Sequence, residues 1–399
     1  MRRFPNPYQG VVKMIRTMTA WTVEVDDAEA AVGEIKSRLD IKNNLLKNTI
    51  GIIACHYEFV HSGVVKAVCE ALPFHVTGTI SSAQSVADHA ENLFLTLLVI
   101  TSDDVEFDVV VTPSLHDEPG RVITKAYKAA ANRSVKPALV FAFAPFMLDN
   151  SGDEYVNVIS EITGGAPCFG TLAIDDTDDF SNCFMICDGA HYSDKMALVL
   201  IYGDISPRFF VANISRNKII AKSAVITKSA GHVLMEVNGR PVAEYFEDLG
   251  LTKASETQYA MSSLPFLLDY NDGTPLVSKL FIGLTPEKHA ICAGAMPEGG
   301  SFHIASADKD DVILTAGEAV DQILEYASNA SGLLVYSCVG RGMTLGAEQF
   351  LEMDLINQRM GKVLPFIMAF SGGEICPTQV SDDKAINRFH NDAFIACLF

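Results

Sequence analysis

Three short segments near the end of the chain carry residue types that bind small charged molecules. The run Tyr336-Ser-Cys-Val-Gly-Arg-Gly342 follows an apolar stretch and precedes an expected helix. Its glycines allow a tight turn with free backbone N–H groups, and its arginine adds a planar charged fork that suits a carboxylate or a phosphate. The run Ser371-Gly-Gly-Glu-Ile-Cys-Pro377 places a glutamate on a flexible turn, and His390-Asn391 introduces the last apolar run. We expect the three segments to converge on one pocket.

Two functions fit these residues, and each gives them different roles. In a binding site for an amino acid or a similar small carboxylate, Arg341 binds the carboxylate and Glu374 binds the ammonium group. In a hydrolase or transferase, Cys338 is the nucleophile and His390 is its base, which requires sulfur and imidazole within hydrogen-bond distance. A structural role also fits: an ion pair between Arg341 and Glu374, a packed thiol and a capped final strand.

The sequence predicts neither a metal nor a cofactor. Its nine cysteines are an odd number and several lie in apolar runs, so we expect reduced, buried thiols. Cys183 and Cys187 are four residues apart, which is not the spacing of a zinc site, and the acidic loop 175–179 lacks the glycine and the glutamate of an EF-hand. The signatures of nucleotide-binding loops, serine hydrolases and zinc proteases are missing. We therefore expect a protein without enzymatic activity.

Length and charge exclude several classes of protein. The chain has 399 residues, which suggests two or three domains, and 49% of them are hydrophobic, which is enough for a sizeable core. Thirty Lys and Arg against 49 Asp and Glu give a net charge of −19, which disfavours binding to nucleic acid or to an anionic membrane. The first twenty residues lack the apolar region of a secretory signal, and no apolar run reaches the ~20 residues of a membrane helix. We expect a soluble, cytoplasmic protein without membrane insertion.

One pattern of apolar and helical stretches occurs three times along the chain, at 49–101, 138–202 and 332–399. Each copy reads as a strand, a helix, a strand that opens on proline, and a further strand, with the continuous apolar runs of buried strands. The turns after the proline-initiated strands align without gaps, and the seventh position of each carries a side-chain oxygen. We expect the three β-α-β-β units to superpose, with these residues at equivalent strand ends: Gln84, Asp176 and Glu374.

Between the second and third copies, β-branched residues alternate with turn signals such as Asn238-Gly239 and Asn271-Asp272-Gly273. This pattern is typical of antiparallel strands that follow one another in a meander. The predicted fold is therefore α/β (mixed α+β), with large mixed sheets flanked by helices, built from the three units and a central antiparallel β meander. The strands of the meander are expected at 209–213, 218–227, 232–237, 276–284, 289–294 and 301–305, with a short helix at 241–249.

The C-terminal motifs resemble those of the FIST family. Ser337-Cys-Val-Gly-Arg341, Gly373-Glu-Ile-Cys-Pro377 and His390-Asn391 before an apolar strand are similar to the signature of its C-terminal part. Val237-Asn-Gly-Arg-Pro-Val-Ala243 resembles the segment that joins its two parts, and 167–176 resembles a glycine-and-acid turn of its N-terminal part.

This resemblance implies a sensory protein of signal transduction that binds small molecules such as amino acids. It runs from about Thr22 to the end of the chain and implies an N-terminal domain at 22–235 and a C-terminal domain at 236–399. The expected partners are a small-molecule ligand and either a separate output protein or a second copy of the chain, since no residues remain for an output domain. From their chemistry, the following signature residues are expected to contact the ligand: Cys338, Arg341, Gly373, Glu374, His390 and Asn391.

Overall fold

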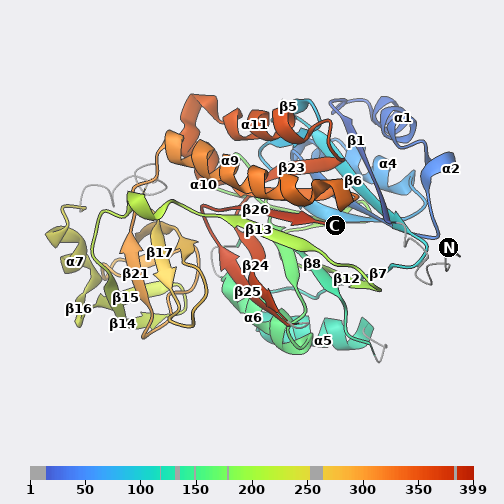
Figure 1. Cartoon of the computed structure of the whole chain (residues 1–399). Helices are drawn as coiled ribbons and strands as arrows, with labels where there is room; N and C mark the ends of the chain where they lie inside the picture. Colours follow the sequence, from blue (N-terminus) through green and yellow to red (C-terminus); the bar gives the residue numbers. More distant parts are fainter. Residues whose placement is uncertain are drawn as a thin grey trace, which may run out of the picture.

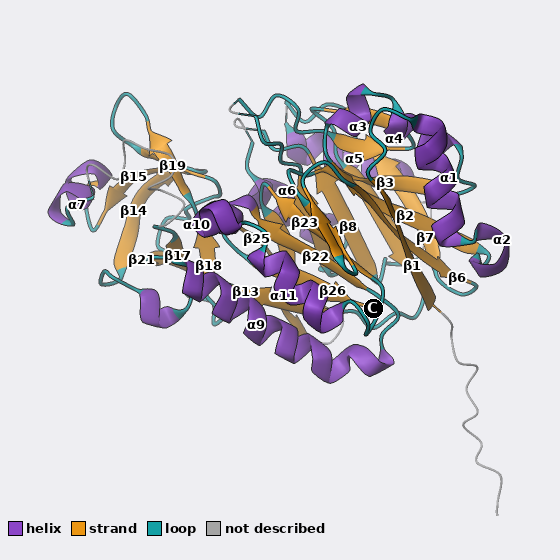
Figure 2. Cartoon of the chain, turned by 90° about the horizontal axis from the view of Figure 1, so that it is seen from above, coloured by secondary structure: helices purple, strands orange, loops and turns teal. Residues whose placement is uncertain are grey.

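Three six-stranded mixed sheets and one antiparallel sheet make up the computed structural model (Figure 1). It describes residues 15–116, 118–130, 135–147, 150–177, 179–251, 264–381 and 384–399. Helices lie on the outer faces of the mixed sheets, whose strands are stacked between them (Figure 2). The predicted fold of large mixed sheets flanked by helices is confirmed.

Each mixed sheet is built mainly by one repeat of the chain. A repeat begins with an edge strand, continues through a central strand and a strand parallel to it, and ends with a hairpin and an antiparallel strand. The first repeat contains β1 (Ile15–Thr22), α1 (Ala28–Leu39), α2 (Ile41–Asn44), β2 (Asn48–Cys55), α3 (Glu58–His61), α4 (Val64–Glu70), β3 (His75–Ile80), β4 (Gln84–Val86), β5 (His89–Glu91) and β6 (Leu95–Ser102). The second contains β7 (Glu106–Val111), α5 (Pro119–Ala130), β8 (Leu139–Ala144), α6 (Gly152–Ile162), β9 (Cys168–Leu172), β10 (Met185–Cys187), β11 (Ala190–Tyr192) and β12 (Ala197–Tyr202). The third contains β13 (Arg208–Ala212), α9 (Lys309–Tyr326), β22 (Leu333–Cys338), α10 (Val339–Leu345), α11 (Leu351–Met360), β23 (Phe366–Ser371), β24 (Glu374–Ser381), β25 (Lys384–His390) and β26 (Phe394–Leu398).

The hairpin of each repeat joins the sheet of another repeat. Strand β4 pairs with β23, β10 pairs with β3, and β24 pairs with β9, so each repeat gives its hairpin to one neighbour and receives a hairpin from the other. Within each repeat the central strand pairs in parallel with the strand that follows its helix: β2 with β3, β8 with β9, and β22 with β23. The three predicted units therefore share one topology and form a closed ring.

The register of the hairpins corrects the predicted position of Asp176. Gln84 and Glu374 are the first residues of their hairpins and occupy equivalent positions of the ladder, as predicted. In the second repeat this position belongs to Met185, because a longer loop, 173–184, precedes the hairpin. Asp176 lies in that loop, and the alignment without gaps overlooked the longer loop.

An antiparallel sheet is inserted into the third repeat, between β13 and α9 (Figure 1, at the left). Its strands follow the order β18-β17-β21-β14-β15-β20-β19, and β16 pairs with β15. The insertion, which we call the inserted sheet, contains β14 (Ala224–Ala230), β15 (Val233–Val237), β16 (Arg240–Pro241), α7 (Val242–Asp248), β17 (Phe266–Asp269), β18 (Val277–Lys279), β19 (Phe281–Leu284), β20 (Ala290–Cys292) and β21 (Ser301–Ile304). The predicted antiparallel strands are confirmed in part: the strand expected at 218–227 begins only at Ala224, β17 was not predicted, and 209–213 forms β13, which pairs with β26 at the edge of a mixed sheet. The same alternation of apolar and polar residues suits an edge strand of either sheet.

Strands from the two sequence domains expected at 22–235 and 236–399 pair with each other. Strand β13 pairs with β26, and β9 pairs with β24. The boundary at 235 stays a prediction, but the mixed sheets contain residues from both sides of it.

The main apolar core lies between the three mixed sheets. The central strands β2, β8 and β22 have long, almost fully buried runs, as their apolar sequences predict. Side chains from all three repeats meet in the space that the sheets enclose, among them Ile52, Phe141 and Tyr336. Two further clusters fill the outer layers, one under α1, α4, α9 and α11, and one under α5 and α6. The interior therefore has a rigid centre, and the polar residues of interest lie at the ends of its strands.

The substitution Gly170→Ala tests the close pairing of β8 and β9. A Cβ atom at position 170 would lie 1.9 Å from the carbonyl oxygen of Ala142, so the two strands would have to separate. We expect the free energy of unfolding to fall by about 3–5 kcal/mol, measured by urea denaturation. The control is Gly317→Ala on α9, where the nearest atom to the new Cβ lies 3.9 Å away; it should stabilise the protein by about 0.5–1 kcal/mol. If both substitutions changed the free energy of unfolding by equally small amounts, the close pairing of β8 and β9 would be contradicted.

Candidate functional site

The expected site residues lie where β22 ends and α10 begins. Cys338 is the last residue of β22, and its N–H donates to the carbonyl oxygen of Ala393 in front of β26 (2.9 Å). The side chain of Cys338 is buried and lies beside the carboxyl groups of Glu374 and Asp392. Asn391 lines the same cavity as Cys338. The structure therefore brings Cys338, Glu374 and Asn391 together.

Nε and Nη2 of Arg341 are bound within the protein, whereas its buried Nη1 has no hydrogen-bond partner, and a role of Arg341 in ligand binding stays a prediction. Its fully buried guanidinium donates to Oε1 of Glu352 on α11 from Nε (2.9 Å) and from Nη2 (2.6 Å). Nη2 also donates to the carbonyl oxygen of Val312 (2.9 Å) and to the hydroxyl of Thr315 (3.2 Å), both on α9. The expectation of a solvent-accessible pocket lined by Arg341 and Glu374 is wrong, and so is an ion pair between the two. The reason is that α9, α10 and α11 pack around the guanidinium and supply its acceptors.

Glu374 is held at the start of β24 by a turn that requires glycine. A Cβ atom at Gly373 would lie 2.3 Å from the ring of Phe389, so the ring packs directly on the backbone of the turn. Glu374 itself is fully buried; its Oε2 accepts a long hydrogen bond from the N–H of Ala393 (3.4 Å), and its carboxyl also interacts with the side chains of Ser371 and Cys338. Its Oε1 has no hydrogen-bond partner. Buried carboxylates are normally paired, so this oxygen is an unused acceptor in the interior.

His390 does not make the contact that a nucleophile and its base require. Its Nε2 lies 3.3 Å from the carbonyl oxygen of Cys376, and no hydrogen bond joins its ring to Cys338 in the described part of the chain. Burial, assisted by the charge of Lys279, lowers the pKa of His390 to about 3. Burial and the neighbouring carboxylates raise the pKa of the Cys338 thiol well above its ordinary value. Both shifts work against a thiolate and an imidazole base at neutral pH.

Asn391 and Asp392 carry further unpaired polar atoms in the interior. Neither atom of the Asn391 amide and neither oxygen of the Asp392 carboxyl has a hydrogen-bond partner, although both side chains are buried. Each buried polar group without a partner costs about 1–3 kcal/mol. Together with Oε1 of Glu374, these atoms form a concentrated set of donors and acceptors that fits a polar ligand group.

A cavity of about 100 Å³ is lined by Asn391 and by Cys338, and the carboxyls of Glu374 and Asp392 lie beside Cys338 without lining the cavity themselves. Asn391 and Cys338 form its polar end, and its other walls are mainly apolar. The walls come from three parts of the chain: Phe146, Ile174 and Phe180 of the second repeat, Leu280, Phe281, Ile282 and Ala293 of the inserted sheet, and Val339, Gly340, Met343 and Gly372 of the third repeat. Such a cavity suits a small molecule with one polar and one apolar end.

Asp392 was missed by the sequence analysis. It has the left-handed backbone conformation (φ 51°) that aspartate tolerates better than most residues. Burial raises the pKa of its carboxyl to about 7, against the opposing effect of Arg341. Burial and the charge of Asp392 also raise the pKa of Glu374. The sequence does contain one signal for it: Asp392 directly precedes the apolar run 393–399, where an acidic residue cannot easily reach solvent.

The first repeat contains equivalent positions, which gives an internal comparison. In both repeats a residue at the end of the central strand, His56 just after β2 and Cys338 as the last residue of β22, donates its N–H to the carbonyl in front of the closing strand, at 3.0 Å in the first repeat and 2.9 Å in the third. The serine of the turn also donates to the carbonyl two residues later, at 2.8 Å in both. The equivalent pairs are His56 and Cys338, Gln84 and Glu374, and Asn92 and Asn391.

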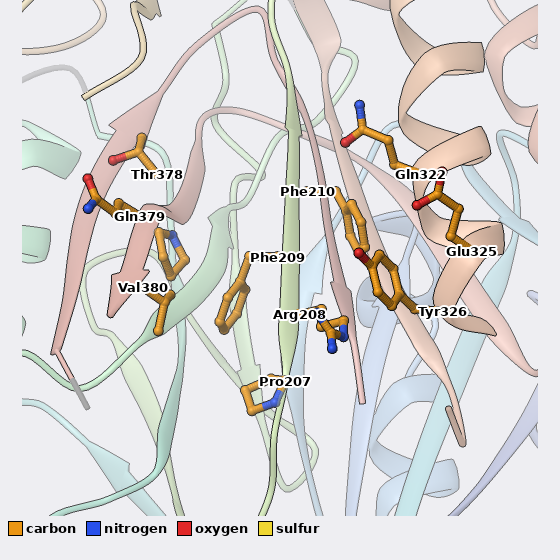
Figure 3. Close-up of a pocket in the computed structure, with 11 residues that line it drawn as sticks. Pro207, Arg208, Phe209, Phe210, Gln322, Glu325, Tyr326, Thr378, Gln379 and Val380 are labelled. Carbon is orange, nitrogen blue, oxygen red and sulfur yellow. The ribbon is translucent and has the colours of Figure 1, made fainter. Parts of the chain in front are cut away.

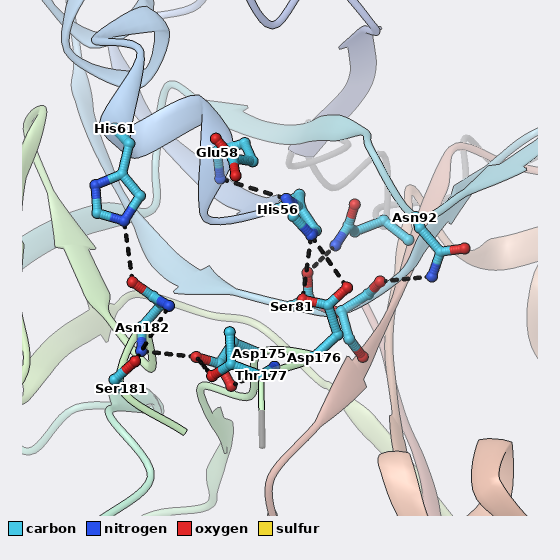
Figure 4. A network of polar contacts seen from close by, with 12 residues as sticks. His56, Glu58, His61, Ser81, Asn92, Asp175, Asp176, Thr177, Ser181 and Asn182 are labelled. Carbon is cyan, nitrogen blue, oxygen red and sulfur yellow. Dashed lines mark hydrogen bonds and ion pairs between the residues drawn. The ribbon is translucent and has the colours of Figure 1, made fainter. Parts of the chain in front are cut away.

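Most polar groups of the first repeat are satisfied within the protein (Figure 4). The side-chain amides of Gln84 and Asn92 donate to the carbonyl oxygens of the 81–82 turn (2.6 and 2.8 Å), although Oε1 of Gln84 has no partner. His56 lies 3.4 Å from the carboxylate of Asp176 on the loop of the second repeat. The third repeat has a carboxylate in place of the glutamine amide, and its asparagine is unpaired. Of these two equivalent places, the third repeat leaves more polar groups available for a ligand.

A larger groove of about 440 Å³ lies elsewhere, between β13, α9 and β24 (Figure 3). There the guanidinium of Arg208 stacks on the ring of Tyr326, 4.0 Å from its centre. None of the residues that line this groove carries a buried polar atom without a partner. The groove therefore lacks the feature that distinguishes the cavity at Asn391.

Within the described ranges, no group of three or more His, Cys, Asp or Glu side chains is arranged to hold a metal ion. The prediction of a protein without metal or cofactor stays a prediction. No helix in these ranges combines the length and the apolar character needed to cross a membrane.

Comparison with known proteins identifies two family domains. The sequence profile of the FIST N domain matches residues 49–240, and that of the FIST C domain matches residues 241–377. No curated protein was found to match. Solved structures found to be similar include phosphoribosylformylglycinamidine synthase II from Thermotoga maritima (10% identity, 96% of this chain, 72% of that chain, TM-score 0.20) and T. maritima PurL complexed with FGAR (8%, 96%, 72%, TM-score 0.21). At such TM-scores we draw nothing from them about fold or function.

The buried pair of Arg341 and Glu352 predicts a specific pattern of stability changes. Arg341→Ala leaves the buried Glu352 carboxylate without its cation and with only the hydroxyl of Ser337 as a side-chain donor, and we expect it to lower the free energy of unfolding by about 3–5 kcal/mol. The double substitution Arg341→Met, Glu352→Met removes both charges and should restore most of this loss. Urea denaturation of the three proteins measures the difference. If Arg341→Ala lowered the free energy of unfolding no more than the double substitution does, the structural role of the pair would be contradicted.

The raised pKa of Asp392 predicts a pH-dependent gain in the variant Asp392→Asn. Below about pH 4 the carboxyl is protonated in both the folded and the unfolded chain, so the wild type carries no penalty. As the pH rises towards 7, the unfolded state ionises first and the wild type loses stability, whereas the variant does not. We expect the variant to be more stable by about 2–4 kcal/mol at pH 8 and by much less at pH 4, measured by urea denaturation. A difference that is constant between pH 4 and 8 would contradict the shift.

Proposed function

Because the chain belongs to the FIST family, whose domains are sensory domains implicated in signal transduction, we propose that it senses a small molecule bound in the cavity at Asn391. The observation that carries the proposal is an apolar cavity lined by the unpaired amide of Asn391 and by Cys338, with the buried, unpaired atoms of Glu374 and Asp392 beside Cys338. A protein interior that serves only stability pairs such groups or replaces them by apolar ones.

The charges around the cavity favour a ligand with an ammonium group. Glu374 and Asp392 are acidic, and the nearby guanidinium of Arg341 is bound to Glu352. An ammonium group donates three hydrogen bonds, and charge-assisted bonds to carboxylates are among the strong ones. We therefore no longer assign the ligand carboxylate to Arg341. We keep the assignment of the ligand ammonium group to Glu374.

The size and the walls of the cavity favour a short apolar group on the same ligand. About 100 Å³ of space is bordered by aromatic and aliphatic side chains such as Phe146, Phe180 and Leu280. A small amino acid with an apolar side chain, or the corresponding amine, has both parts. The amide of Asn391 offers one donor and one acceptor for a further polar group of the ligand, such as an amino-acid carboxylate.

We propose binding without catalysis as the role of the site. The high pKa of the Cys338 thiol and the low pKa of His390 support this over the hydrolase or transferase alternative. A sensor of this kind passes its signal to a separate output protein or to a second copy of the chain. The net charge of −19 argues against nucleic acid as that partner.

Thermal-shift measurements with three related compounds test the proposal. L-leucine has an ammonium group and a carboxylate, 3-methylbutylamine has only the ammonium group, and 4-methylpentanoate has only the carboxylate. At pH 8, we expect the first two to stabilise the protein, by about 2.7 kcal/mol at a hundred times their dissociation constant, and the third to have no effect. Stabilisation by the carboxylate alone would overturn the proposed ligand class, and no effect of any compound would count against the site.

The variant Glu374→Gln removes the charge and keeps the shape of the side chain. It should weaken binding of 3-methylbutylamine by about 1.5–3 kcal/mol, which is roughly 10- to 100-fold in dissociation constant, measured by calorimetry. The matched control is Asp176→Asn. It removes the carboxylate that lies beside His56 of the first repeat, and it should leave the affinity for 3-methylbutylamine unchanged. Equal losses in the two variants would point to a general effect of the protein's charge.

A further inference from the structure

The cavity lies on the seam between the inserted sheet and the core formed by the mixed sheets, to which the second and third repeats both contribute walls. One wall comes from the inserted sheet, at 280–282 and Ala293, and the opposite wall includes Cys338, Gly340 and Asn391. Figure 1 shows the inserted sheet as a separate lobe beside the mixed sheets. Any change in the distance between the two bodies therefore changes the cavity itself.

One buried carboxylate joins the two bodies next to the cavity. Asp153 lies in the first turn of α6, and all its side-chain partners beyond its own turn come from the inserted sheet. Its oxygens accept from Nζ of Lys279 (2.9 Å each), from the N–H of Ala295 (2.7 Å) and from the hydroxyl of Tyr270 (3.3 Å). Lys279 is fully buried and also donates to the carbonyl oxygen of Phe389 (2.7 Å).

The partners of this carboxylate adjoin the residues that line the cavity. Lys279 precedes Leu280, and Ala295 follows Ala293 by two residues. The region leaves no space for a side chain at Gly294, whose Cβ atom would lie 2.6 Å from Nζ of Lys279 and 2.7 Å from Oδ2 of Asp153.

The ring of Phe389 links the start of α6, where Asp153 lies, to the turn that holds Glu374. A Cβ atom at Gly152 would lie 2.4 Å from this ring, and one at Gly373 would lie 2.3 Å from it. The ring is therefore wedged between the start of α6 and the turn that holds Glu374. Two residues further on, the N–H of Asn391 donates to the carbonyl oxygen of Ser278 in the inserted sheet (3.0 Å).

We propose that Asp153 positions the cavity: by binding Lys279 and Ala295 it holds the wall at 280–293 against Cys338 and Asn391, so that binding and closure of the inserted sheet on the core are one event. This inference rests on the proposed function for the ligand, but not for the closure of the seam. A buried ion pair seldom adds stability over an apolar pair of similar volume, yet its directional bonds fix one geometry. Three donors of the inserted sheet bind the carboxylate of Asp153, and these directional bonds fix the position of the inserted sheet.

The test compares the double variant Asp153→Asn, Lys279→Met with the wild type. Both charges are removed together, so no unpaired ion remains in the interior. The first readout is the rate at which iodoacetamide modifies Cys338 in the full chain without ligand, followed by peptide mass spectrometry. We expect this rate to rise at least tenfold, while the rate at Cys397, buried in the core, stays unchanged. The second readout is hydrogen exchange of 277–282, which should become faster.

The control variant is Lys218→Met, which removes a partly exposed ion pair with Asp308 at the other side of the same junction. It should leave the modification of Cys338 at the wild-type rate. Should the double variant fail to fold, Gly294→Ala displaces the same contacts with both charges kept, and it should raise the same rate. An unchanged Cys338 rate in a folded variant, or equal increases at Cys338 and Cys397, would overturn the proposal.

A binding measurement separates this inference from the proposed function. The dissociation constant of 3-methylbutylamine should rise at least tenfold in the double variant and stay unchanged in Lys218→Met. If the wild type binds no amine, the proposed ligand class fails, and the labelling and exchange data still decide whether Asp153 closes the seam. If the amine binds equally well to the double variant, the positioning role fails and the ligand class stands.

Discussion

The exchange of hairpins among the three repeats is the constraint on which the rest of the core depends. A hairpin that pairs with the parallel strand of another repeat must insert its first side chain into the interior, at the end of that strand. The three positions that result carry Gln84, Met185 and Glu374. An amide, a thioether and a carboxylate thus face equivalent surroundings, and the difference in their chemistry decides what each place does. Only the carboxylate calls for a charged partner, and the protein supplies none to its Oε1.

The buried charges of the third repeat fall into two classes that serve different ends. The guanidinium of Arg341 has four hydrogen bonds to α9 and α11, and Lys279 has three to Asp153 and Phe389. Apart from Nη1 of Arg341, the nitrogens of these cations have partners, and these bonds fix how helices and sheets are placed. The carboxyls of Glu374 and Asp392 are unmatched, and burial raises the pKa of both. Burial disfavours the charged form of both carboxyls, and a cation bound next to them would favour it.

The sequence was sufficient to predict the repeat and its buried central strands, because such strands leave continuous apolar runs that are visible without a partner. It did not predict the edge strands β1 and β7 or the strands of the three hairpins, which are short or carry polar residues. It also predicted that Cys338, Glu374 and Asn391 lie close together, because each of them follows or precedes such an apolar run. It was misleading for Arg341, because the competing acceptor, Glu352, lies on a helix whose position depends on packing. It missed Asp153, since nothing in the segment that begins α6 reveals that the inserted sheet, more than a hundred residues later, places Lys279 against it. Contacts between distant segments follow from topology, which local patterns do not encode.

Under the proposed function, the position of the cavity would let one site both bind a ligand and report its presence. A ligand shifts a conformational equilibrium only by the difference between its contacts in the two states. At Asn391 the walls belong to the second repeat, the third repeat and the inserted sheet, so a ligand that touches all three loses contacts whenever they separate. Each 1.4 kcal/mol of lost contact changes the ratio of closed to open forms about tenfold. A cavity enclosed within one repeat would bind equally well in both forms and would report nothing. The seam is therefore the place where binding energy can be converted into a change of shape.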